Sequence, residues 1–136
     1  MDRPRFERMV DCLARRGPDA SGIWADDLVV LGHRRLSILD LSDAGAQPMV
    51  SDNGNTVLIY NGECYNHLEL RRRLGEVRWR STGDTETLLR AYEKYGSTFV
   101  QHVSWMFSLA IYNQCAPKLS LYPDRFGAKP LYYHHK

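Results

Sequence analysis

Residues 52–63 read Asp-Asn-Gly-Asn-Thr-Val-Leu-Ile-Tyr-Asn-Gly-Glu and contain the strand around which the rest of the chain can be arranged. Residues 52–55 favour a turn, and the run 56–60 that follows is rich in residues that favour strands. Because this run is apolar throughout, it predicts a central strand that is covered on both faces. Asn61 and Gly62 then bring an amide side chain and a backbone N–H to the end of the strand.

Helices and shorter strands are predicted around this strand. Apolar residues recur at helical spacing over 6–13, and Pro4 suits the first turn of that helix. A second helix is predicted over 84–95, with Asp84 as its N-cap. Strand blocks and helix blocks follow one another without a regular βαβ order, which favours an α+β layered fold. The other predicted elements are a hairpin from 22–24 and 28–31, a helix over 66–74 between Asn66 as N-cap and Gly75, a short helix over 97–103, and strands over 77–80, 106–112, 119–122 and 131–133.

The composition is that of an ordinary globular domain. Its 136 residues predict one domain over 1–136, with 43% hydrophobic and 25% charged residues. A net charge of +2 gives no electrostatic reason to expect binding to nucleic acid or to a membrane surface, and no apolar run is long enough to span a bilayer. Cysteines at 12, 64 and 115 form no C-x-x-C pair, so we predict no metal site and a reducing cytoplasm. The arginines at 71–73 are expected on a solvated helix face.

Four polar segments border the apolar elements, at 16–19, 33–37, 61–63 and 82–86. The fork of an arginine suits a carboxylate, and Asp or Glu can bind an ammonium group. The Asn-Gly pair offers an amide and an N–H for an oxyanion hole. Together these groups suit an amino-acid zwitterion with a second carbonyl to polarise. Each also has a structural alternative: Asn61-Gly62 as a turn, Asp84 as a helix cap and Arg35 as a surface charge.

Six stretches in a fixed order carry a resemblance to a known family: RGPDASG (16–22), LGHRRLSILDLSDAGAQPM (31–49), YNGECYNHLELR (60–71), STGDTETLL (81–89), MFSLAIY (106–112) and DRFGAKPLYY (124–133). With them the chain resembles, from residue 16 to residue 133, class II glutamine amidotransferase domains. The HRRLSI form at residues 33–38 is more similar to asparagine synthetases than to the purine or hexosamine amidotransferases.

The resemblance implies an N-terminal-nucleophile hydrolase fold, an αββα sandwich of two antiparallel sheets between helix layers. In that family a cysteine at the processed N-terminus attacks the side-chain amide of glutamine, with its own α-amine as the base. A thioester forms, ammonia leaves and water releases glutamate. No metal or cofactor is implied for this domain. ATP and Mg²⁺ belong to a synthetase domain, and its Ser-Gly-Gly-x-Asp-Ser loop does not occur in these residues.

The resemblance also assigns roles to particular residues. Arg35 is expected to hold the α-carboxylate of glutamine. Asn61 and Gly62 are expected to form the oxyanion hole, while Glu63 and Asp84 receive the α-ammonium group. The residues expected to line the pocket are Leu36, Ser37, Ile38 and Leu39.

The start of the chain departs from the family pattern. It reads Met1-Asp2-Arg3, where the family has Met-Cys-Gly-Ile and a first strand. We therefore expect the first strand and the nucleophile to be missing. Cys12, which follows apolar residues in the first helix, is expected to be buried, and Cys64 to be a packing residue.

The resulting expectation is a glutaminase domain of asparagine synthetase type. Its ancestral role would be to supply ammonia from glutamine for asparagine synthesis, beside a synthetase domain or subunit. We expect little or no activity, because the chain is a truncated fragment or a relative without the nucleophile. The alternatives are a non-enzymatic module that binds glutamine, glutamate or a partner protein, and an unrelated α+β binding domain. A homodimer is expected, because strands 56–60 and 106–112 contain no charge and no proline to guard an exposed edge.

Overall fold

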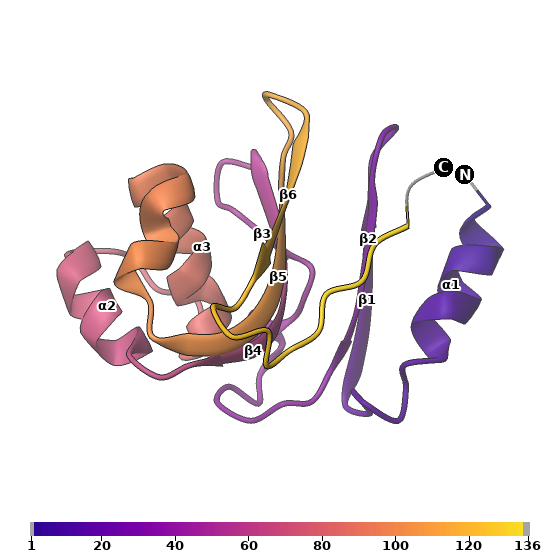
Figure 1. Cartoon of the computed structure of the whole chain (residues 1–136), viewed down its shortest axis with the longest axis horizontal. Coiled ribbons are helices and arrows are strands. Elements are labelled where there is room, and N and C mark those ends of the chain that lie inside the picture. The colour runs from indigo at the N-terminus through magenta and orange to yellow at the C-terminus, as the bar shows by residue number, and fades with distance from the viewer. Residues whose placement is uncertain (1, 135–136) are drawn as a thin grey trace.

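Two antiparallel sheets face each other between two layers of helices in the computed structural model, which describes residues 2–134 (Figure 1). Helices α2 and α3 cover the outer face of a four-stranded sheet of order β3-β4-β5-β6. Helix α1 covers the outer face of the two-stranded sheet β1-β2. The elements are α1 (Arg3–Asp11), β1 (Ala20–Ala25), β2 (Val30–Arg35), η1 (Asp43–Gly45), β3 (Met49–Val50), β4 (Thr56–Cys64), α2 (His67–Leu74), α3 (Asp84–Tyr95), η2 (Gly96–His102), β5 (Trp105–Asn113) and β6 (Lys118–Pro123).

This arrangement confirms the predicted α+β sandwich and its central strand. Strand β4 pairs with β5 along its whole length, and Val57 and Leu58, which point to opposite faces, are both fully buried. The strand continues through Asn61 and Gly62, so the interpretation of that pair as a turn is wrong. At Gly62 a Cβ atom would lie 2.7 Å from Cα of Phe107, so the absence of a side chain lets the ladder continue. The expectation that the family's first strand is missing from this chain stays a prediction.

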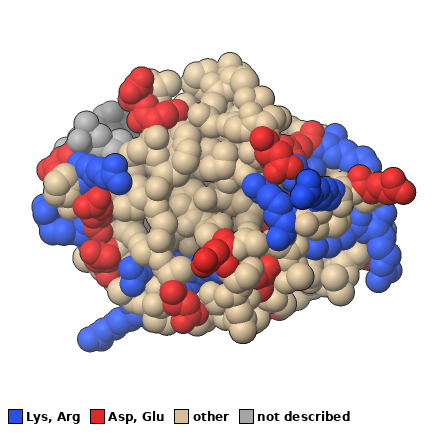
Figure 2. All heavy atoms as spheres, turned by 180° about the vertical axis from the view of Figure 1, so that it is seen from behind, with Lys and Arg blue, Asp and Glu red and all other residues tan. Residues whose placement is uncertain are grey.

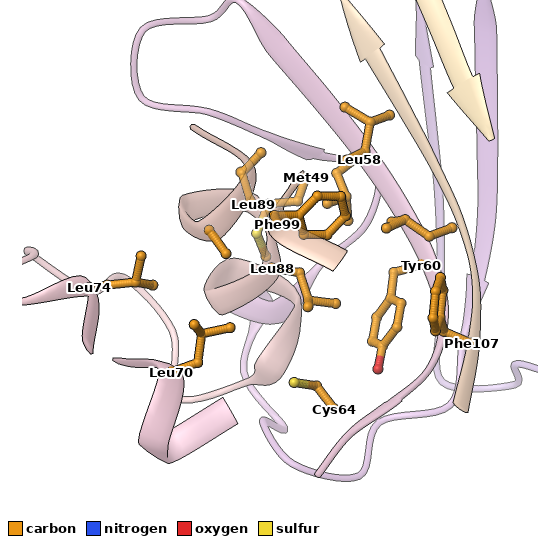
Figure 3. Close-up of a cluster of buried hydrophobic side chains, with 13 residues drawn as sticks. Met49, Leu58, Tyr60, Cys64, Leu70, Leu74, Leu88, Leu89, Phe99 and Phe107 are labelled. Carbon is orange, nitrogen blue, oxygen red and sulfur yellow. The ribbon is translucent and has the colours of Figure 1, made fainter. Parts of the chain in front are cut away.

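The main hydrophobic core lies between the four-stranded sheet and the helices α2 and α3 (Figure 3). Phe99 of η2 packs edge-to-face against Tyr92 and Tyr122, with ring centroids 5.6 and 5.3 Å away. The buried residues of this core are Met49, Leu58, Tyr60, Cys64, Leu70, Leu74, Leu88, Leu89, Ala91, Phe99, Phe107, Leu109 and Ile111.

A smaller core joins the two sheets, and helix α1 closes the far side. Leu31, Val57 and Tyr112 are its buried members, and Trp24 packs on Tyr112 with 5.6 Å between ring centroids. On the outer face of β2, a Cβ at Gly32 would lie 2.5 Å from Cγ2 of Val10 in α1. The missing side chain at Gly32 therefore lets α1 pack directly on the strand.

Two predicted strands do not form, and one formed strand was not predicted. Residues 77–80 lie outside both sheets, because the backbone N–H of Arg80 donates to the carboxylate of Glu86 in place of a neighbouring strand. Residues 131–133 are also not a strand, and the side chains at 132 and 133 are exposed. Strand β3 has two residues, too few for a periodic pattern. Among residues 2–134, no helix has the length and apolar character needed to cross a membrane.

Several side chains lie differently from their prediction. The N-cap of α3 is Gly83 rather than Asp84, whose carboxylate turns toward Tyr60 instead. Asn66 occupies the N-cap position of α2 but makes no capping hydrogen bond, since its amide bridges to residues 102 and 104. Arg71 is not on a solvated face: its guanidinium lies 4.1 Å from the ring centroid of Trp79.

Candidate functional site

A pocket of about 530 Å³ lies between the two sheets, a volume typical of small-molecule sites. Its walls come from β2, β4, β5, the loop after β2, the start of α3 and residues 129–131. The pocket gathers most of the predicted site residues. Ser37 is the exception and does not line the pocket; its backbone N–H donates to Oδ2 of Asp19 at 2.7 Å. The predicted site residues that line the pocket are Arg35, Leu36, Ile38, Leu39, Asn61, Gly62, Glu63 and Asp84.

Strand alternation explains why these side chains meet. Successive residues of a strand point to opposite faces. On β2, His33 and Arg35 therefore point toward the four-stranded sheet, whereas Arg34 points toward α1 and donates to the carbonyl oxygen of Gly17 at 3.2 Å. On β4, Asn61 and Glu63 share the face of Val57 and Ile59, which pack in the core between the sheets.

Arg35 is held by the loop that follows it. Its Nη1 donates to the carbonyl oxygen of Ser42 at 2.8 Å, and its Nη2 donates to the carbonyl oxygen of Asp40. At Gly45, a Cβ atom would lie 2.9 Å from Cζ of Arg35, so this glycine provides the space that the guanidinium fills. Because a guanidinium has five N–H donors, it can bind a ligand carboxylate as well.

The backbone of β4 turns toward the pocket beside His33 and Gln47. Strand β3 begins at Met49, which pairs with Leu58, so the part of β4 that follows Leu58 has no neighbouring strand on that side within residues 2–134. The N–H of Tyr60 donates to Oε1 of Gln47 at 2.6 Å, and Nε2 of His33 lies 3.1 Å from the carbonyl oxygen of Tyr60. Side chains therefore take the place of a strand there.

The N–H of Gly62 points to the same side as that of Tyr60, because alternate residues of a strand share a direction. Its cross-strand neighbour Phe107 is turned to the opposite side, where its carbonyl oxygen accepts from Asp124 N at 2.9 Å. Further along β4, the N–H of Cys64 reaches Oδ2 of Asp84 at 2.9 Å. The Gly62 N–H thus points between the groups bound by Tyr60 and Cys64.

His33 is a neutral imidazole in this arrangement. Since a carbonyl only accepts, Nε2 carries the proton and Nδ1 carries the lone pair. Nδ1 is buried and has no hydrogen-bond partner within residues 2–134. Burial lowers the pKa of His33 and the nearby Arg35 lowers it further, while the bond to the Tyr60 carbonyl acts in the opposite direction.

Asp84 is buried at the start of α3, and its Oδ2 accepts from two groups of β4. The Tyr60 hydroxyl donates to it at 3.0 Å and the Cys64 N–H at 2.9 Å. Burial, followed by the charge of Asp84, raises the pKa of Tyr60 far above its usual value, so the phenol stays protonated. The carboxylate also lies in the first turn of α3, where the helix dipole favours a negative charge.

The segment that leads into Asp84 is held from three sides. Asp40 accepts from Thr82, Arg71 donates to the carbonyl oxygens of residues 81 and 83, and Glu86 accepts from the N–H groups of residues 80 and 81. Asp40, Gln47, Arg71 and His33 were given no role by the sequence reasoning. The available signal was that all four are polar and lie within the stretches that resemble the family.

None of the three cysteines lines the pocket. Cys12 follows the end of α1 and is exposed, so the prediction that it is buried is wrong; it lies about 200° around the helix from Val10, the buried residue of α1. Cys64 is buried in the main core, as predicted, and burial raises the pKa of its thiol to about 12. Cys115 is exposed between β5 and β6. Within the described part of the chain, no group of three or more His, Cys, Asp or Glu side chains is placed to hold a metal ion.

The surface on the side opposite to the view of Figure 1 carries both signs of charge (Figure 2). Lys and Arg lie beside Asp and Glu at both sides of this face, and its middle has few charged residues. Arg73 pairs with Glu69, and Arg90 pairs with Glu93 at 3.1 Å. Mixed charge of this kind gives no strong field of one sign over this face.

Comparison with known proteins identifies what this chain is similar to. A family profile described as "Glutamine amidotransferase domain" matches residues 1–136. Asparagine synthetase [glutamine-hydrolyzing] 2 of Bacillus subtilis is 42% identical over 125 residues, which cover 92% of this chain and 17% of that protein. Asparagine synthetase B [glutamine-hydrolyzing] of Escherichia coli is 40% identical over 121 residues, which cover 88% of this chain and 22% of that protein. The chain therefore spans about a fifth of the length of these relatives.

A solved structure supports the fold. It is a glutamine phosphoribosylpyrophosphate amidotransferase from Bacillus subtilis, complexed with ADP and GMP. The superposition covers 62% of this chain and 21% of that one, with a TM-score of 0.51 and 20% sequence identity. At that identity the likeness concerns the fold alone, and it agrees with the two facing antiparallel sheets.

Proposed function

This chain belongs to the glutamine amidotransferase domain family, in the form found in glutamine-hydrolysing asparagine synthetases, and from that premise we propose that the pocket between its sheets binds L-glutamine. The observation that supports this most is that Arg35 of β2 lines the same pocket as Asn61 and Glu63 of β4 and Asp84 of α3. These groups match the two charged ends and the amide of glutamine. In the intact protein, the domain would supply ammonia for asparagine synthesis.

Each group has a distinct task in the proposed complex. Arg35 pairs with the α-carboxylate through the N–H groups that the loop carbonyls leave available. The α-ammonium group binds between Glu63 and Oδ1 of Asp84, since Oδ2 already accepts from β4. The side chain of Asn61 and the N–H of Gly62 polarise the amide carbonyl. The methylene groups of glutamine pack against Leu36, Ile38 and Leu39, whose side chains are more than two-fifths exposed without a ligand.

A second candidate is a module that binds glutamine or glutamate without hydrolysing it, and the positions of the cysteines favour it for the 136-residue polypeptide. Hydrolysis needs a nucleophile beside the Asn61-Gly62 pair. Cys64 is buried in the core on the other side of β4, while Cys12 and Cys115 do not line the pocket. We therefore propose that this polypeptide binds glutamine and releases no ammonia above background.

Calorimetry and an ammonia assay on the purified polypeptide test both statements. L-glutamine should bind, and Arg35→Ala should weaken binding by about 1.5–3 kcal/mol, the usual contribution of a charge-assisted contact. Arg35→Lys should also weaken it, because lysine lacks the fork. Arg80→Ala is the matched control, since Arg80 also donates to a backbone carbonyl, that of Val50 at 2.9 Å, but does not line the pocket.

Equal affinities of wild type and Arg35→Ala would remove the proposed role of Arg35, and no binding of glutamine at all would reject the function. Ammonia release that survives replacement of all three cysteines would reject the non-hydrolysing candidate. Release that is lost in Cys64→Ala alone would show that a relocated nucleophile exists.

The partner and the compartment are also proposals. We propose a synthetase domain or subunit as the partner, because the similar proteins carry this domain as about a fifth of a larger chain. ATP and Mg²⁺ would bind to that partner, not here. A reducing cytoplasm remains the proposed location.

The original argument for a homodimer was that strands 56–60 and 106–112 form unguarded edges, and this argument does not hold. Residues 56–60 and 106–112 belong to β4 and β5, the inner strands of the order β3-β4-β5-β6, so neither strand is an outer edge of the sheet. Within residues 2–134 the outer edges of the four-stranded sheet are β3 and β6, and the hairpin β1-β2 has no further strand beside it. A dimer would have to form at one of these edges. Sedimentation over a range of concentrations tests it, and a monomer at every concentration rejects it.

A further inference from the structure

Asp40 lies between the loop after β2 and the segment that leads into α3. It is 7% exposed, and both carboxylate oxygens are used. Oδ2 accepts from N and Oγ1 of Thr82 at 2.7 and 3.1 Å. Oδ1 accepts from N and Oγ of Ser42 at 2.8 and 2.6 Å. One carboxylate thus binds two segments that are far apart in the sequence.

These two segments hold Arg35 and Asp84, the residues proposed to bind the two charged groups of the ligand. The carbonyl oxygen of Asp40 accepts from Nη2 of Arg35. On the other side, Thr82 precedes Asp84 by two residues, and a Cβ at Gly83 would touch Cβ of Asp40 at 3.4 Å. Asp40 therefore contacts Arg35 through its backbone and the approach to Asp84 through its side chain.

Gln47 of the same loop also donates to Oγ1 of Thr85 at 3.3 Å, whereas Arg71 and Glu86 bind, of the two segments, only the one that leads into Asp84. Arg71 donates to the carbonyl oxygens of Ser81 and Gly83 at 3.0 and 2.7 Å, but it comes from α2, in the helix layer. Glu86 accepts from N of Ser81 at 2.7 Å and comes from α3 itself. Within residues 2–134, the hydrogen bonds of Arg71 and Glu86 do not reach the loop that holds Arg35.

From this geometry we propose that Asp40 is a positioning residue, which fixes the separation of Arg35 and Asp84 and thereby selects ligands that carry both an α-carboxylate and an α-ammonium group. The inference rests on the proposed glutamine pocket. In an α-amino acid both charges are attached to one carbon, so their separation is fixed. Two charged partners can bind them together only if the protein holds its own groups at a matching distance.

The ionisation of Asp40 suits this role. Hydrogen bonds from Ser42, followed by those from Thr82, hold the pKa of the carboxyl well below its usual range although burial opposes them. Asp40 is therefore charged at neutral pH and accepts from both segments at once. A neutral amide in its place could accept on one side only, and its NH₂ group would face N–H donors on the other.

The test compares three ligands on wild type and Asp40→Asn by NMR titration. The ligands are L-glutamine, its analogue without the α-amino group, and its analogue with the α-carboxylate converted to an amide. We expect Asp40→Asn to weaken glutamine binding about tenfold, near 1.4 kcal/mol, and to weaken each one-ended analogue less than about threefold. The preference for the zwitterion falls accordingly.

The matched control is Asp26→Asn. Asp26 also accepts from two backbone N–H groups, those of Leu28 and Val29 at 2.8 and 2.7 Å, but it lies in the hairpin turn outside the pocket. This control should keep the wild-type preference. If Asp40→Asn does not fold, Thr82→Val can replace it in the test. This variant removes the Oγ1 donor to Oδ2 of Asp40 and should also lower the preference for glutamine over the one-ended analogues.

An equal loss for all three ligands would show that Asp40 supports the fold only, and would overturn the inference. Unchanged glutamine affinity in Asp40→Asn would overturn it as well. These outcomes differ from failure of the proposed function, in which wild type itself does not bind glutamine and the role of Asp40 falls with it.

Discussion

Nε2 of His33 lies 3.1 Å from the carbonyl oxygen of Tyr60, and this contact ties the two sheets together one residue before Asn61. The strand segment that carries the proposed oxyanion hole is therefore held by an imidazole ring. Protonation would keep that bond but would add a second N–H at the buried Nδ1, which has no hydrogen-bond partner within residues 2–134, so burial of the ring favours its neutral form.

The first prediction concerns pH. The pKa of His33 is lowered in the folded state, mainly by burial, so the unfolded chain binds a proton more readily once the pH falls below about 6.5. The stabilising effect of His33 is complete above that pH and is lost as the pH falls below it, by at most about 1.4 kcal/mol per pH unit. Urea unfolding between pH 8 and 5 measures the slope.

The control is His33→Gln, which can still donate to the Tyr60 carbonyl but does not titrate. Burial also lowers the pKa of His67, which adds a slope of the same sign, so the difference between wild type and His33→Gln isolates His33. Identical slopes in the two proteins would contradict the prediction.

Gly62→Ala should destabilise the fold. The new Cβ would lie 2.7 Å from Cα of Phe107 and nearer still to the backbone oxygen of Met106, so β4 and β5 would have to separate. We expect a loss of about 1–3 kcal/mol, as for overpacking in general. Thermal unfolding measures it. Gly83→Ala is the control, since its Cβ would meet only ordinary contact at 3.4 Å, and equal melting temperatures for the two variants would count against the close approach.

Gly45→Ala should displace Arg35 while leaving the fold intact. The new Cβ would overlap the guanidinium, the far end of a flexible side chain, which can move. We expect glutamine affinity to fall as much as in Arg35→Ala, with a change in melting temperature of a few degrees at most. In the double variant Arg35→Ala/Gly45→Ala the losses should not add, because no guanidinium remains to be displaced. Additive losses would show that Gly45→Ala weakens binding by a route other than displacement of the Arg35 guanidinium.

The sequence predicted well the elements whose signal is local. The apolar run at 56–60 predicted β4, and the periodic residues from Leu88 to Tyr95 predicted α3. The candidate pocket was predicted less directly: resemblance to a family supplied Arg35 and Asn61 together, and the structure places both on one pocket. Periodicity alone predicts which face a residue occupies, but not which element lies opposite.

The errors arose where a distant residue decided the outcome. Asp84 has the local signal of a helix cap, yet its carboxylate bonds the hydroxyl of Tyr60, 24 residues away in the sequence. Arg71 follows the charge pattern of an exposed helix face, yet it turns inward to Thr87 Oγ1 at 2.8 Å. Both residues are polar groups that satisfy buried partners, and nothing in their own segment marks those partners.

Tyr60→Phe should lower stability by about 1–2 kcal/mol, because it leaves Asp84 Oδ2 with one donor fewer in a buried place. The aromatic ring keeps its packing in the main core (Figure 3). Denaturant unfolding measures the loss, and Tyr132→Phe is the control, since that side chain is 87% exposed. If both variants unfold alike, the hydroxyl of Tyr60 does not stabilise Asp84.

The last prediction concerns the thiols. Cys12 and Cys115 are exposed and should react quickly with a thiol reagent at neutral pH, whereas Cys64 should react only as the protein unfolds. Its thiol is buried and its pKa is raised to about 12, so almost no thiolate is present. Replacing Cys64 with alanine should remove the slow phase and leave the fast one. Labelling the two exposed thiols should leave glutamine binding unchanged, because neither lines the pocket. Fast reaction of Cys64, or loss of binding on labelling Cys12 or Cys115, would place a thiol at the pocket after all.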